Sequence, residues 1–186
     1  MNQSISLLSS IFHLFLVPNF CGGVVVNGDI VNNLCSNVSI ASDHVLNYDF
    51  CISSLEANPL SRTSDIFGLV VISMELSSNN ATYIRTYIDS ILKDGKQEPE
   101  LARTCLQECI GFYSTALEDV QAAMKAFKSK HYYTARNQLS NANIYADTCK
   151  RGFQDLGVDF SPLKKQDYDF FQLTLFSAST IRIILQ

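Results

Sequence analysis

Apolar residues recur at alternating steps of four and three through the second half of the chain, which is helical rather than strand-like spacing. Between residues 131 and 156 the series is Ala135, Leu139, Ala142, Ala146, Cys149, Phe153 and Leu156. Between residues 98 and 128 it is Ala102, Leu106, Cys109, Tyr113, Ala116, Val120, Ala123 and Phe127. Each series lies on one face of a helix, so the pattern predicts two long helices that bury facing stripes.

Two more long segments have the same character, one over about residues 63–93 and one over about residues 165–185. The last is very apolar, but Arg182 and several polar residues favour a buried closing helix over a membrane tail. Four long helices with short loops predict an all-α fold, an up-down-up-down four-helix bundle over residues 63–186. Two shorter helical stretches, about residues 29–36 and 43–55, predict a small leading hairpin within residues 24–60. We expect Ser42 or Asp43 to cap its second stretch.

The first 23 residues have the features of a secretory leader. No charged side chain occurs before Asp29, and residues 5–17 form an apolar run too short to span a bilayer comfortably. We therefore expect residues 1–23 to be a signal peptide, and residues 24–186 to be one secreted domain. The net charge of −4 excludes a nucleic-acid binder or a protein held on anionic lipid, because both need a basic face.

Secretion also bears on two acceptor patterns for N-linked glycans. Asn37-Val38-Ser39 and Asn80-Ala81-Thr82 both fit the sequence Asn-X-Ser/Thr. Asn37 and Asn80 are therefore the candidate glycosylation sites.

The cysteines predict two disulfides in this oxidising compartment. In an antiparallel hairpin, residues equally distant from the turn face each other. The midpoint of Cys109 and Cys149 is residue 129, at a break between helices, and the midpoint of Cys35 and Cys51 is residue 43, between the two short stretches. Cys105 is left over as a free thiol. We expect a monomer, with a dimer linked through Cys105 as the alternative.

No catalytic constellation stands out. The histidines beyond the leader, His44 and His131, have no identifiable partner set, and the acids Asp147, Asp167 and Asp169 are expected to be solvated. There is no phosphate-binding loop, nucleophile elbow or paired-histidine motif. Cys105 and Cys109 lack a second compact ligand pair for zinc. The sequence therefore predicts a protein that is not an enzyme and needs no metal or cofactor.

The arrangement resembles the plant invertase and pectin methylesterase inhibitor family, and within it the pollen-allergen branch. The matching segments are Asn47-Tyr48-Asp49-Phe50-Cys51 with Ile52-Ser53-Ser54-Leu55, then Cys109-Ile110-Gly111-Phe112-Tyr113-Ser114-Thr115-Ala116, and Asp147-Thr148-Cys149 leading to Phe153. The resemblance implies an inhibitor secreted to the extracellular space, the apoplast and cell wall, that binds a cell-wall hydrolase one to one, covers its substrate cleft and performs no chemistry.

Two targets compete under this resemblance. In characterised invertase inhibitors a Pro-Lys-Phe tripeptide enters the sucrose site of the enzyme. At the corresponding positions this chain has Tyr132-Tyr133-Thr134. The segment from Asp29 to Leu92 is also net acidic, which suits a basic pectin methylesterase. We therefore expect pectin methylesterase as the target, with acid invertase as the alternative, and a non-inhibitory pollen or structural protein as the alternative from another class. Tyr132 and Tyr133 are candidate partner-binding residues, although packing at the helix start is a competing role.

Overall fold

The computed structural model describes residues 28–94, 99–159 and 162–186; the leader expected at residues 1–23 lies outside them. Within this part of the chain every regular element is helical, which confirms the all-α prediction. The elements in order are α1 (Gly28–Ala41), α2 (Tyr48–Glu56), the short 3₁₀ helix η1 (Pro59–Arg62), α3 (Ile66–Lys93), α4 (Glu100–Lys128), α5 (Tyr132–Asp155) and α6 (Lys164–Ile184).

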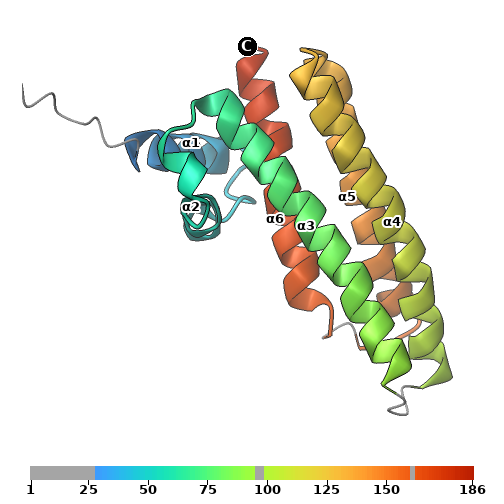
Figure 1. Cartoon of the computed structure of the whole chain (residues 1–186). Helices are drawn as coiled ribbons and strands as arrows, with labels where there is room; N and C mark the ends of the chain where they lie inside the picture. Colours follow the sequence, from blue (N-terminus) through green and yellow to red (C-terminus); the bar gives the residue numbers. More distant parts are fainter. Residues whose placement is uncertain (1–27, 95–98, 160–161) are drawn as a thin grey trace, which may run out of the picture.

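Helices α3 to α6 form the predicted up-down-up-down bundle (Figure 1). The α4 and α5 stripes interlock along their length, and α6 closes the bundle against α3 and α5. Each predicted stripe residue is buried except Leu156, which is half exposed because α5 ends at Asp155. The stripe in α5 therefore stops at Phe153, one turn earlier than the spacing predicted.

Two disulfides join helices at the predicted positions. Cys109 of α4 is bonded to Cys149 of α5, with the Cα atoms 5.0 Å apart. Cys35 of α1 is bonded to Cys51 of α2, with a Cα separation of 5.8 Å. The first joins α4 to α5 towards the ends of these helices that lie away from the α4–α5 turn, and the second closes the leading hairpin.

The hairpin differs from its prediction in where its helices begin and end. The polar segment 37–42, expected to separate the two stretches, is largely helical, because Val38 and Ser39 face inward while their neighbours face solvent. The second helix begins at Tyr48 and is capped by Asn47, whose side chain accepts a hydrogen bond from the Phe50 N–H at 2.8 Å. The expectation of a cap at Ser42 or Asp43 was therefore wrong.

Polar contacts from α6 fix the hairpin on the side of the bundle. The buried side chain of Gln172 accepts from the Asn47 N–H at 2.7 Å and donates to the Val45 carbonyl at 3.0 Å. Arg182 donates to the carbonyl of Ala41, the last residue of α1, at 2.5 Å. A second apolar cluster is built from α1, α2, α3, the loop residue Leu46 and Phe176 of α6.

Among the described helices, α6 included, none combines the length and hydropathy of a membrane span.

Candidate functional site

The turn between α4 and α5 has an unusual backbone for its sequence. Helix α4 ends with the His131 N–H bonded to the Ala126 carbonyl at 2.9 Å and the Lys130 N–H bonded to the Phe127 carbonyl at 2.9 Å. This pair of bonds is a Schellman motif, which puts Lys130 in the left-handed region with φ of 62°. Helix α5 ends in the same motif, but with glycine at the equivalent place, Gly157, whose φ is 63°. A lysine in this conformation costs about 1 kcal/mol or more relative to glycine.

The two tyrosines predicted to bind a partner start α5 directly after this turn and have different surroundings. Tyr132 is partly buried, with its ring centroid 5.2 Å from that of Phe127 and 6.3 Å from that of Phe67. Tyr133 is 67% exposed. Tyr132 therefore packs the helix start, and Tyr133 is the one that is free to contact a partner.

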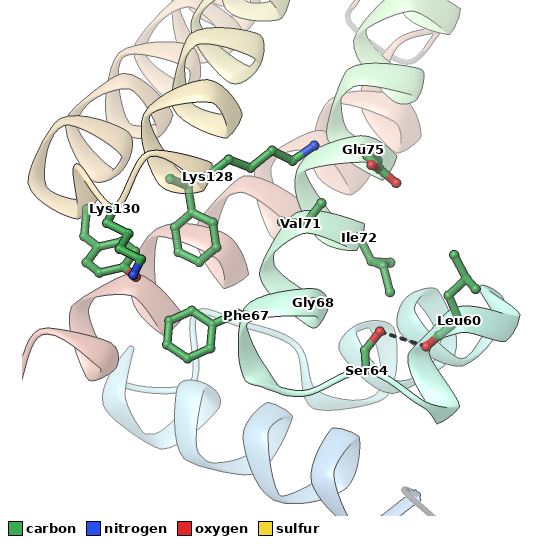
Figure 2. Close-up of a pocket in the computed structure, with 11 residues that line it drawn as sticks. Leu60, Ser64, Phe67, Gly68, Val71, Ile72, Glu75, Lys128 and Lys130 are labelled. Carbon is green, nitrogen blue, oxygen red and sulfur yellow. Dashed lines mark hydrogen bonds between the residues drawn. The ribbon is translucent and has the colours of Figure 1, made fainter.

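A cavity of about 460 Å³ opens beside the turn, between the start of α3 and the end of α4 (Figure 2). Its walls include the rings of Phe67, Phe127 and Tyr132, and Lys128, Lys130 and Glu75 lie around it. Gly68 forms part of the wall because Ser64 packs against it: a Cβ on Gly68 would stand 2.9 Å from the Ser64 Cβ. We call Lys128, Lys130, Tyr132, Tyr133 and this cavity the α4–α5 corner.

The corner is basic. Lys125, Lys128 and Lys130 follow one another through the last turn of α4 and the residues just after it, where cations also interact favourably with the helix dipole. The exposed surface at this end of the bundle therefore combines cations, an exposed tyrosine and an apolar hollow. Such a surface suits recognition of another molecule by contact, since tyrosine is enriched where binding energy concentrates.

A buried, hydrogen-bonded pair of titratable side chains lies elsewhere, between α4 and α6. The Tyr113 hydroxyl donates to Asp167 Oδ1 at 2.8 Å, and Tyr113 is fully buried. Burial is the largest influence on the Asp167 carboxyl and raises its pKa. The negative charge of Asp147 also raises this pKa, whereas the hydrogen bond from Tyr113 and the positive charge of Lys150 lower it. Burial, together with the charge and the hydrogen bond of Asp167, raises the pKa of Tyr113. The expectation that Asp167 is solvated was therefore wrong. The sequence signal for this pair was the spacing that placed Tyr113 on the buried stripe of its helix.

The other two acids named from the sequence form ion pairs within their own helices, and the two histidines lie in different loops. Asp147 is exposed and forms a salt bridge with Arg151 at 3.0 Å, and Asp169 forms a salt bridge with Lys165. His44 and His131 are both exposed and far apart along the chain, in the loop after α1 and in the α4–α5 turn. Over the described ranges, no three His, Cys, Asp or Glu side chains gather in a way that could hold a metal ion.

Cys105 is the free cysteine of the described chain and is buried at 2% exposure. Its thiol lies 3.8 Å from the Gly152 carbonyl oxygen, and burial raises its pKa. A disulfide between two folded chains through Cys105 would require the α4–α5 interface to open. The structure therefore gives no support to the dimer considered from the sequence.

Together these features define a disulfide-stapled helical bundle whose described surface includes a basic, partly apolar corner suited to contact with another molecule. A family model described as plant invertase/pectin methylesterase inhibitor matches residues 29–178. The chain belongs to this family, and it is accordingly an inhibitor-family protein rather than an enzyme.

Individual relatives agree on the family and differ in the target that they name. A Platanus acerifolia protein named "Putative invertase inhibitor" is 38% identical over 184 residues, covering 99% of each chain. The "Cell wall / vacuolar inhibitor of fructosidase 2" of Arabidopsis thaliana is 24% identical over 151 residues, 78% of this chain and 79% of that one. A crystal structure of a mutant pectin methylesterase inhibitor from Arabidopsis matches with a TM-score of 0.67 at 18% identity, covering 79% of this chain and 96% of that chain. This last likeness concerns the fold.

Proposed function

We propose that this protein is a secreted inhibitor of an acid invertase and that its α4–α5 corner contacts the enzyme. The observation that carries the choice of target is the likeness, over almost the full length of both chains, to the Platanus acerifolia protein named "Putative invertase inhibitor". The sequence alone favoured pectin methylesterase. That preference depended on the missing Pro-Lys-Phe tripeptide and on an acidic segment, and both are weaker grounds than a relative 38% identical throughout.

The geometry of the corner offers an alternative to the missing tripeptide. Tyr133 provides an exposed ring at the start of α5, and Lys130 provides a cation two residues after the end of α4. The strained backbone of Lys130 supports a role in binding, because strain of this kind is concentrated at functional sites. In this proposal Tyr133 and Lys130 replace the ring and the cation of the tripeptide.

Pectin methylesterase remains the second candidate target. The observation that favours it is the absence of Pro-Lys-Phe at residues 132–134. The family description covers inhibitors of both enzymes, so both belong in one experiment.

The test is a titration of the oxidised protein, without residues 1–23, into a plant acid invertase and a plant pectin methylesterase at mildly acidic pH. We expect invertase activity to fall to near zero at about one equivalent while esterase activity is retained. Loss of esterase activity alone would replace the first target with the second. Full activity of both enzymes across several isoforms would overturn the inhibitor proposal.

Tyr133→Ala tests the corner itself. Removing a binding tyrosine at the centre of an interface costs about 2 kcal/mol, so the inhibition constant should rise about 30-fold. Tyr83→Ala is a matched control, because Tyr83 is an exposed tyrosine of α3 outside the corner and its loss should leave inhibition unchanged. Equal inhibition by Tyr133→Ala and the parent would place the contact surface elsewhere on the bundle.

A further inference from the structure

The C-terminal half of α3 carries a partly exposed aromatic pair that the proposed inhibitory corner does not use. The rings of Tyr83 and Tyr87 are stacked, with centroids 5.9 Å apart and planes inclined by 6°. Tyr83 is 53% exposed, whereas Tyr87 is partly buried against the bundle core. A flat apolar face of this kind at the surface is a place for a ligand that stacks.

The glycan acceptor sequence Asn80-Ala81-Thr82 lies in the same helix immediately before this pair. Residues 80, 83 and 87 are three and seven positions apart, so they share one face of α3. Side chains of a helix lean towards its N-terminus, which brings the Tyr83 ring over the turn that contains Asn80. Because Asn80 and Tyr83 are three positions apart on this face, a sugar attached to Asn80 has the ring of Tyr83 within reach.

The amide of Asn80 is oriented in a way that suits such an attachment. Its Oδ1 is buried with no hydrogen-bond partner, and the structure shows no hydrogen bond from its Nδ2, the atom that an N-linked glycan modifies, to a described residue. Thr82, the third residue of the acceptor sequence, is exposed and donates only to the Ser78 carbonyl at 2.9 Å. A glycan on Nδ2 therefore breaks no hydrogen bond of the helix.

We infer that Asn80 carries an N-linked glycan whose first sugar packs on the Tyr83–Tyr87 pair. The apolar face of a pyranose ring covers the exposed part of Tyr83, which removes apolar surface from water. The attached glycan is the occupant of this aromatic patch. The inference requires the secretion that is part of the proposed function, but not the identity of the inhibited enzyme.

The first experiment expresses the complete chain in plant leaf tissue and measures glycan occupancy at residue 80 by peptide mass spectrometry. We expect the Asn80 peptide to be modified, to lose the glycan in Thr82→Ala and to keep it in Thr82→Ser, which preserves the acceptor sequence. An unmodified Asn80 peptide, including one from protein that is retained in the cell, would overturn the inference. Inhibition is measured separately, so a failed glycan result and a failed inhibitor result are distinguishable.

The second experiment tests the packing on Tyr83 in an Asn37→Gln background, which leaves Asn80 as the acceptor under study. The melting temperature is measured before and after removal of the glycan by a peptide N-glycosidase, in the parent and in Tyr83→Ser. The enzyme converts Asn80 to Asp in both proteins, so that change cancels in the comparison. We expect glycan removal to lower the melting temperature of the parent by about 2 to 4 °C more than that of Tyr83→Ser. Equal shifts in the two proteins would show a glycan that does not contact Tyr83.

Discussion

At the scale of single residues, the pair formed by Tyr113 and Asp167 is the most unusual feature of the bundle. A fully buried hydroxyl from α4 donates to a largely buried carboxyl group near the start of α6. A hydrogen bond to a charged group contributes about 1.5 to 3 kcal/mol, which opposes the cost of removing the carboxylate from water. Burial is the larger influence, since the pKa of Asp167 is raised.

This raised pKa predicts a direction for the pH dependence of stability. Between the ordinary pKa of an aspartate and the higher pKa of folded Asp167, the folded protein binds more protons than the unfolded chain, so stability falls as pH rises. Asp167→Asn keeps an acceptor for Tyr113 but cannot ionise. We expect this variant to gain stability relative to the parent as pH rises through that window, as measured by urea unfolding at a series of pH values.

The matched control for this prediction is Asp89→Asn, which changes an exposed aspartate of α3. Its stability relative to the parent should show no comparable trend across the same window. Parallel pH profiles for the parent and Asp167→Asn would contradict the argument.

At the scale of elements, the ends of α4 and α5 form a natural comparison. Both helices end in a Schellman motif, with Lys130 and Gly157 at the left-handed position. We expect Lys130→Gly to raise the free energy of unfolding by about 1 kcal/mol, because glycine adopts this backbone without a Cβ clash. If Lys130 contacts the inhibited enzyme, the same change should weaken inhibition; urea unfolding and the inhibition titration measure the two effects.

Gly157→Lys is the converse control. It places a lysine in the same motif at the other end of α5, so it should destabilise the protein by a similar amount, while inhibition by the folded fraction is unchanged. A Lys130→Gly variant that is less stable than the parent would contradict the account of strain at the corner.

The two disulfides join elements over different lengths of chain. Cys109 and Cys149 are 40 positions apart, and Cys35 and Cys51 are 16 apart. The loop-entropy relation gives about 4 kcal/mol for the first and about 3 kcal/mol for the second. We therefore expect paired alanine substitution of Cys109 and Cys149 to lower the unfolding free energy more than that of Cys35 and Cys51, as measured in urea. The reverse order would show that native contacts, rather than loop length, decide the contribution of each bridge.

At the scale of the whole molecule, the bundle was predictable because the sequence pattern that specifies each helix is local and repeats every three to four residues. The spacing of residues such as Leu139 and Phe153 fixes which helix face is buried, and the cysteine midpoints fix which helices are paired. The bounds of the hairpin were predicted less well. The backbone of residues 37–41 stays helical because Val38 fills the second core, and that packing depends on distant parts of the chain.

The corner was only half predictable, for a related reason. Its two tyrosines could be named from the sequence, but their different exposure could not, because Tyr132 is covered by Phe67 from α3 and Phe127 from α4. The cavity likewise needs Leu60 and Ser64, which are more than sixty positions before the turn. Contacts between residues this far apart leave no periodic signal.

The attachment of the leading hairpin to α6 sets an order of events during synthesis. The 16-residue loop from Cys35 to Cys51 closes through local encounter, so its disulfide can form soon after the segment is made. Gln172 and Arg182, which hold the hairpin in place, are translated more than one hundred residues later. The hairpin can therefore be oxidised, and partly covered by Leu69 and Ile72 of α3, before α6 completes its docking through Gln172, Phe176 and Arg182.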